Sequence, residues 1–359
     1  MGRRASTARI FAALAATASL AACASITPEV SAPSPDAAAG VSIPSPATGQ
    51  EGLGGRWDRS LAGLRADDQR VANVAFRLET ANTALCPDVG PRAGLVLQDA
   101  LQYSARERPA AVAALHVGDL PSVDAIADGS PAARAGLRVG DVVIAIDGAP
   151  VPAPAKAADP ATRPADYAPL QAAVSALDAA LARRPAALEV LRGPERLRLT
   201  VDSVPGCDYD VEVLPGPDLN ASADGRHVFI SSAMVDFARS DDMLALVLGH
   251  ELGHDLLHHH ARLGQSDLAH RVLGDLASSP ESLKLTEREA DYVGLYLVAR
   301  AGYEIADAPA FFAALPAESP FSWSHPSDAE RARALAMTRD EIEAKRRLDE
   351  PLTPNAAPN

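Results

Sequence analysis

The spacing of apolar residues divides the chain into a helical beginning, a strand-rich middle and a helical end. From about residue 61 to 85, apolar positions recur at helical spacing and predict one amphipathic helix. Between residues 93 and 205 five β-like runs surround a helical stretch, Tyr167 to Ala182. The runs are Leu95–Leu97, Val123–Ile126, Val142–Ile146, Ala187–Leu191 and Leu197–Val201. Two further helix patterns lie between Ser240 and Gly302, so the order predicts an α+β fold.

The N-terminal residues have the pattern of a targeting segment. Three arginines form a basic region: Arg3, Arg4 and Arg9. The apolar stretch Ile10 to Leu20 is too short to span a bilayer, and Leu20 to Cys23 resembles the bacterial lipobox. We expect residues 1–22 to be a lipoprotein signal peptide, with Cys23 acylated, and residues 23–56 to be a flexible tether. The alternative is an ordinary signal peptide in which Cys23 is incidental.

Composition and charge limit the possible partners. Hydrophobic residues make up 47% of the 359 residues, which is sufficient for a packed core. The formal net charge of −14 argues against a nucleic-acid partner, which would need clustered lysine and arginine. Ala24 follows the lipobox cysteine instead of aspartate, which favours the outer membrane and a periplasm-facing lipoprotein. Residues 341–359 are charged and then Pro-rich, so we expect a helix end and a disordered tail.

The two other cysteines, Cys86 and Cys207, flank the strand-rich middle. An even pair in an oxidising compartment predicts a disulfide, and the alternative is two buried free thiols. The bond would join the early helix to a strand from Asp208 to Val213, and it would hold both ends of an inserted segment.

A glycine-rich pattern in the middle of the chain resembles the bacterial PDZ pattern. It runs from Gly129 through Asp141 to Gly148 and matches at over a dozen positions. Ser130 can cap a short helix that begins at Pro131, and Asp147 with Gly148 favours a turn. The resemblance implies a PDZ-like β-rich domain at residues 93–205 that binds peptides at a sheet edge, or alternatively a spacer with a filled groove.

The candidate chemistry lies in a helix that Ser240 can cap. This helix contains the motif HExxH, His250 to His254. Spacing of i, i+4 places both imidazoles on one helix face, within reach of one zinc ion. Glu251 is then available as the general base that takes a proton from a zinc-activated water.

Two residues compete for the role of third zinc ligand. His260 has the metzincin spacing, but that motif needs glycine where Leu257 stands. Glu287 lies in the next helix and would complete an open His, His, Glu site. Asp291, one turn further on, would accept a hydrogen bond from a ligand imidazole. Glu289 is the weaker candidate because it points to another side of that helix.

The motif order resembles a known family of enzymes. HExxH, then Glu287 to Asp291, then His325-Pro326 and Arg331 resembles the zinc endopeptidases of the HtpX and CAAX prenyl protease type, which include BepA-like periplasmic proteases. The resemblance implies a mostly helical gluzincin-type metalloprotease domain with a small β-sheet. It also implies that His325 lies near the metal and steadies the oxyanion or occupies the open site, and that Arg331 pairs with acidic groups beside the ligands.

Together these patterns predict an envelope zinc endopeptidase that acts on misfolded or misassembled proteins. Its parts would be an N-terminal helix at residues 57–92, the PDZ-like domain and a catalytic domain at residues 206–340, with a lipid anchor at Cys23. The rival from another class is a PDZ-type peptide-binding adaptor or chaperone with a vestigial metal site. A metzincin-type enzyme that uses His260 is the second rival.

Overall fold

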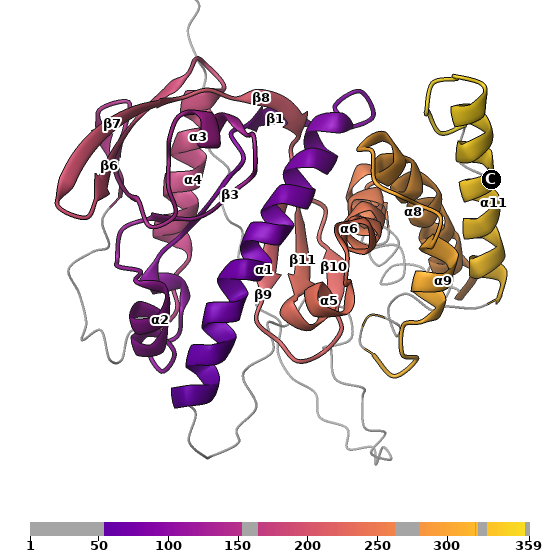
Figure 1. Ribbon diagram of the computed structural model, residues 1–359, viewed down its shortest axis with the longest axis horizontal. Helices are drawn as coiled ribbons and strands as arrows, with labels where there is room; N and C mark the ends of the chain where they lie inside the picture. Colours follow the sequence, from indigo (N-terminus) through magenta and orange to yellow (C-terminus); the bar gives the residue numbers. More distant parts are fainter. Residues whose placement is uncertain (1–53, 153–163, 263–279, 320, 322–328, 356–359) are drawn as a thin grey trace, which may run out of the picture. The chain divides into compact units, whose positions relative to one another are not determined.

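In the residues that it describes, the computed structural model combines long helices with three sheets, which confirms the predicted α+β class (Figure 1). The described residues are 54–152, 164–262, 280–319, 321 and 329–355. The predicted signal peptide, the lipobox cysteine Cys23, most of the tether and His325 lie outside them. Within the described part of the chain, no helix has both the length and the apolar character that a membrane crossing requires.

The first helix, α1 (Gly54–Ala81), begins and ends earlier than the apolar spacing predicted. Its buried face includes Val71, Val74 and Leu78, which belong to the main hydrophobic core. A second set of side chains faces the strand-rich middle, where the Gln69 amide donates to the Ile126 carbonyl at 2.7 Å. The helix therefore contributes to two sets of contacts, and only the apolar set leaves a periodic pattern in the sequence.

The strand-rich middle forms one antiparallel sheet with the helices that the PDZ pattern predicts. In spatial order its strands are β2 (Leu95–Gln98), β3 (Ser122–Ile126), β4 (Val142–Ile146), β6 (Ala186–Arg192) and β7 (Glu195–Val201), and β5 (Ala149–Pro150) pairs with β4. The helix α4 (Ala168–Leu181) packs against this sheet and buries Ala173 and Leu177 against Val123 and Leu188.

Local sequence explains the turns of this sheet. The Ser130 side chain accepts from the Ala133 amide and caps the short helix α3 (Pro131–Arg134). Asp147 and Gly148, both at positive φ, turn the chain from β4 into β5. The helix α2 (Arg108–Leu115), which no pattern predicted, forms a small separate core with α1.

The two ends of the sheet segment lie side by side. The strand β1 (Val89–Arg92) pairs antiparallel with β8 (Val204–Cys207), so Val89 lies opposite Cys207. A disulfide joins Cys86 to Cys207 with a Cα–Cα distance of 5.5 Å, well within the reach of such a bond. The bond links the segment after α1 directly to β8.

A third, three-stranded sheet precedes the helical end of the chain. Its strands are, in spatial order, β10 (Ala221–Ala223), β11 (His227–Ser231) and β9 (Asp210–Leu214). The pairing of β11 with β9 is parallel, whereas β10 and β11 form an antiparallel hairpin. The short helix α5 (Ser232–Phe237) follows, capped by Ser231.

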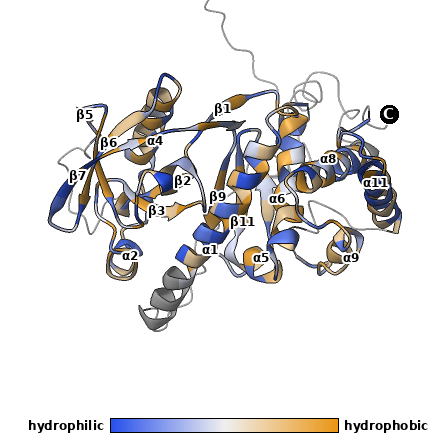
Figure 2. Ribbon diagram, turned by 45° about the horizontal axis from the view of Figure 1, so that its top comes forward, coloured by the Kyte–Doolittle hydropathy of each residue, from blue (hydrophilic) through white to orange (hydrophobic). Residues whose placement is uncertain are grey.

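The helical end contains four described helices, α6 (Asp241–Leu256), α8 (Pro280–Arg300), α9 (Ala308–Ala313) and α11 (Ala329–Arg347). In Figure 2 apolar residues are concentrated on α6, whereas α11 is mostly hydrophilic. The helices α6 and α8 cross in close contact at their glycines. A Cβ added to Gly294 would lie 2.6 Å from the Gly249 carbonyl oxygen, and one added to Gly253 would lie 2.7 Å from the Ala290 carbonyl oxygen. Such distances are shorter than van der Waals contact, so only glycine permits this approach.

The crossing can be tested with the same substitution at two helical glycines. We expect Gly294→Ala to lower the free energy of unfolding by about 1–3 kcal/mol, because the new methyl group overpacks the crossing. Gly63→Ala is the matched control, since Gly63 lies in α1 with open space around its Cα. It should raise the free energy of unfolding by about 0.5–1 kcal/mol. Urea denaturation measures both, and two changes of the same sign would contradict the packing described here.

Candidate metal centre

The helix α6 presents the two histidines of the HExxH motif on one face. Ser240 caps its first turn by accepting from the Met243 amide at 3.2 Å, as the sequence predicted. His250 and His254 lie one turn apart, and their Nε2 atoms are 3.2 Å from each other. His250 is 1% exposed, so its ring lies within the protein interior.

The crossing helix α8 brings Glu287 to the same point. One Glu287 oxygen is 3.5 Å from His250 Nε2, and the other is 3.4 Å from His254 Nε2. Each of the three residues offers one ligand atom, and these atoms all lie within 4.8 Å of one another. Tetrahedral zinc with bonds of 2.0–2.2 Å places its ligand atoms roughly 3.3–3.5 Å apart. The three side chains therefore fit one zinc ion in both chemistry and spacing.

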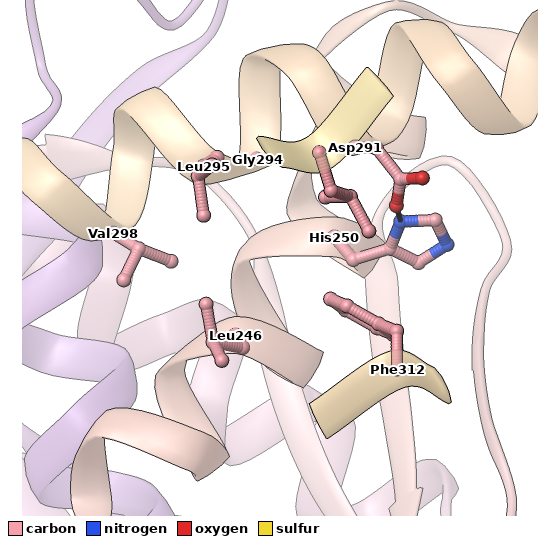
Figure 3. A pocket seen from close by; sticks show the side chains of 8 residues that line it. Leu246, His250, Asp291, Gly294, Leu295, Val298 and Phe312 are labelled. Atoms are coloured by element: carbon pink, nitrogen blue, oxygen red, sulfur yellow. Dashed lines mark ion pairs between the residues drawn. The ribbon is translucent and has the colours of Figure 1, made fainter. Parts of the chain in front are cut away.

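Asp291 and Arg331 support His250 at Nδ1, the ring nitrogen that is not the proposed ligand atom. Figure 3 shows the aspartate beside this nitrogen. An Asp291 oxygen is 2.8 Å from His250 Nδ1, which leaves Nε2 directed toward Glu287. The Arg331 guanidinium donates to both Asp291 oxygens, at 2.7 and 2.8 Å. The ring of Phe312 lies beside His250, with centroids 5.8 Å apart. The imidazole is thus held by one carboxylate and by apolar packing.

Electrostatics at this point favour a positive charge. Burial by itself would lower the pKa of His250, but hydrogen bonds to Asp291 and Glu287 outweigh it and raise that pKa to about 9. Burial also opposes ionisation of Asp291, yet Arg331 and His250 hold the pKa of its carboxyl below the usual value. The carboxylates beside His250 therefore stabilise a positive charge on its ring, whereas burial lowers the pKa of His254.

Glu251 is a buried carboxyl of the HExxH motif, next to His250 in the sequence. It lies in the HExxH turn, is 1% exposed, and has a pKa that burial raises to about 8. A carboxyl with a pKa near neutrality can both accept and return a proton. A bound cation would lower this pKa by favouring the carboxylate.

The structure also assigns partners to the other candidate residues. His260 is exposed and is not part of the group of ligand atoms found among the described residues. Its neighbour His259, which the sequence analysis missed, is 1% exposed and lies 3.0 Å from His254, measured between the two Nδ1 atoms. Glu289 contacts His259 and Arg262 at 2.9 and 2.8 Å. The predicted role of His325 concerns a residue outside the described part of the chain.

Comparisons with known proteins identify the same two parts. The group of possible ligands and the antiparallel sheet described above resemble those of a metalloprotease and of a PDZ domain. Residues 197–274 match the model of Peptidase family M48, and residues 122–161 match that of the PDZ domain. These matches support a peptidase of the M48 type with a PDZ domain. They do not distinguish the HtpX or BepA-like proteins from other members of that type.

Two curated proteins are similar in sequence to parts of this chain. The Mitochondrial metalloendopeptidase OMA1 of Arabidopsis thaliana is 30% identical over 37% of this chain and 32% of its own length. The protein of that name from Schizosaccharomyces pombe is 27% identical over 45% of this chain and 56% of its own length. The chain thus spans about a third to about half of these relatives. A crystal structure of the HtrA3 PDZ domain bound to a phage-derived ligand matches with 23% identity and a TM-score of 0.22, covering 33% of this chain and 88% of that domain.

The buried pair between α8 and α11 can be compared with an exposed pair between the same helices. Arg331 and Asp291 are 5% and 3% exposed in their side chains, whereas Arg288 and Glu330 are 37% and 55% exposed. Arg331→Ala should lower the free energy of unfolding by about 3–5 kcal/mol, because it leaves a buried carboxylate uncompensated. Arg288→Ala should cost less than about 1 kcal/mol. Equal losses for the two variants in urea denaturation would refute this difference.

Proposed function

We propose that the protein is a zinc-dependent endopeptidase of the gluzincin type. The observation that carries the proposal is the convergence of His250, His254 and Glu287, whose ligand atoms lie within 4.8 Å of one another. The match of residues 197–274 to Peptidase family M48 supports it independently. Three protein ligands leave the fourth zinc position open, which is the arrangement of a catalytic site.

The residues of this chain account for the proton transfers of peptide hydrolysis. A zinc ion held by these ligands supplies Lewis-acid activation of water and of the scissile carbonyl. Glu251 accepts a proton from the attacking water and returns it to the departing amine. Asp291 and Arg331 keep His250 oriented during both steps. From its match to the motif order of the zinc endopeptidases, we propose that His325 steadies the oxyanion or occupies the open site.

Two features favour peptides or proteins as substrates, a strand edge near the HExxH helix that is free among the described residues and the match to the PDZ domain. The strand β10 has one partner among the described strands, β11, so its other edge offers backbone groups to an extended peptide. The turn of this hairpin is tied to the HExxH helix, because the Gly225 amide donates to Asp255 at 2.7 Å. The PDZ match at residues 122–161 adds a second peptide-binding element. We therefore propose protein substrates, with misfolded or misassembled envelope proteins as the class.

We propose the cell envelope as the location, with Cys23 acylated and the protein facing the periplasm from the outer membrane. The basic region, the short apolar stretch and the lipobox support this proposal. The two relatives are named as mitochondrial proteins, whereas this N-terminal pattern is typical of bacterial lipoproteins.

Three substitutions separate metal binding from catalysis. Glu251→Gln should retain about one zinc per chain while casein hydrolysis falls by at least about 100-fold, since only the general base is removed. His254→Ala and Glu287→Ala should lose the metal. Metal analysis and casein hydrolysis by the purified proteins measure both effects, and a chelator should abolish hydrolysis by the unaltered protein.

His260→Ala is the control for these variants because it removes an exposed histidine of the same segment. It should keep both zinc and activity, whereas a metzincin-type site would lose them. Full zinc and activity in Glu287→Ala would refute the ligand assignment. Zinc binding without any hydrolysis by the unaltered protein would instead favour the peptide-binding adaptor.

The lipid anchor has its own test. Cys23→Ser should move the protein from the membrane fraction to the soluble fraction, because acyl chains on Cys23 provide the proposed attachment. Fractionation followed by immunoblotting measures the change. Unaltered membrane association of this variant would show that the chain is held there by other means.

A further inference from the structure

A chain of hydrogen bonds leads outward from His254 to buried side chains that the proposed mechanism does not use. Its first link joins His254 Nδ1 to His259 Nδ1 at 3.0 Å. The second joins His259 Nε2 to a Glu289 oxygen at 2.9 Å, and Arg262 donates to the same oxygen at 2.8 Å. His259 and Glu289 are 1% and 8% exposed, so water competes little for these contacts.

The direction of these hydrogen bonds follows from the chemistry of imidazole. A neutral imidazole has one N–H donor and one acceptor nitrogen. If His254 binds a metal through Nε2, its Nδ1 carries the hydrogen and donates to His259 Nδ1. His259 must then carry its own hydrogen on Nε2, where the Glu289 carboxylate accepts it. The reverse direction would place a hydrogen on His254 Nε2 and block the metal position.

We propose that His259 and Glu289 are positioning residues that hold His254 in the tautomer and orientation that bind zinc. The inference rests on the proposed zinc site and adds two residues to it. Arg262, whose side chain is half exposed, donates to one Glu289 oxygen, whereas the buried Arg331 donates to both oxygens of Asp291. Each zinc-binding imidazole is thus backed by a carboxylate and an arginine, directly for His250 and through His259 for His254.

Helix geometry explains why His254 needs an intermediate residue. Asp291 follows Glu287 by one turn of α8, so both carboxylates point toward α6. Glu289 is two positions from Glu287, and successive residues rotate by about 100°, so it points to another side of α8. The imidazole of His259, which follows α6 in the chain, lies between Glu289 and His254 and contacts both.

The backbone after α6 places His259 where this role requires it. In a continuous helix residues 254 and 259 would lie about 140° apart around the axis and could not meet. The helix α6 instead ends at Leu256, and His258 adopts a left-handed conformation with φ of 53°. A non-glycine residue is unfavourable in this region, so the contacts of the following turn must offset its strain.

The test measures zinc affinity directly, by competition with a chromophoric chelator, so it does not depend on peptidase activity. His259→Ala should weaken zinc binding about 10- to 100-fold, and Glu289→Gln should weaken it in the same direction by less. Because both residues act through one chain, the double variant should bind no more weakly than His259→Ala alone. His260→Ala, the exposed neighbour, should bind zinc as the unaltered protein does.

A conservative variant and a spectrum separate positioning from general stability. His259→Asn places an amide oxygen near the Nδ1 position, so it should recover most of the affinity that His259→Ala loses. The visible spectrum of bound Co²⁺ should change in His259→Ala and return toward the original in His259→Asn. Melting temperatures of the metal-free variants show whether each has folded, and Glu289→Gln still decides the matter if His259→Ala has not.

Two results would overturn the inference. One is unchanged zinc affinity in a folded His259→Ala variant, or in Glu289→Gln if His259→Ala does not fold. The other is a loss of affinity in the double variant equal to the two single losses combined. In either case His254→Ala tells the two proposals apart. If that variant loses the metal, the proposed zinc site stands and only the positioning role of His259 and Glu289 is refuted. If it keeps the metal, the zinc site itself is refuted.

Discussion

The close crossing of α6 and α8 is the constraint on which the candidate site depends. Two proposed ligands lie on α6 and the third on α8, and a metal bond tolerates only a few tenths of an ångström. Gly249 and Gly294 bring the two backbones together where larger residues would hold them apart. Both glycines reduce helix propensity. Their presence within the helices is explained by the close approach of α6 and α8, which lets Glu287 on α8 reach His250 and His254 on α6.

The same crossing moves several ionisable groups into the protein interior, and arginines offset part of the resulting cost. Asp291, Glu287 and Glu289 are each at most 8% exposed. Arg331 contacts Asp291 at 2.7 Å and Glu287 at 3.9 Å, and Arg262 contacts Glu289 at 2.8 Å, so each of these carboxylates has an arginine nearby. Glu287 is the one that also faces both His250 and His254. Its carboxylate therefore lies where a cation held by the two imidazoles would be.

Local patterns predicted the parts of the site that depend on helix periodicity. The HExxH spacing placed two imidazoles on one face, and Glu287 with Asp291 followed from a four-residue interval. Caps and turns at Ser130, Ser240 and Asp147 were likewise predictable, since each depends on a few neighbouring residues. No sequence pattern indicated His259, because its contact with His254 requires the left-handed conformation of His258. Nor could periodicity predict pairings between distant segments, such as β1 with β8.

The pairing of β1 with β8 contributes to the stability of the fold independently of any bound metal. Together with the disulfide, it closes a loop between residues 121 positions apart. The chain-entropy model gives such a closure nearly 5 kcal/mol, although measured effects are often smaller. This contribution arises in the unfolded chain and requires no ligand. A metal that binds only the folded state adds stability separately, in proportion to its concentration and affinity. A variant that loses zinc can therefore stay folded, and its loss of metal then reports on the ligands themselves.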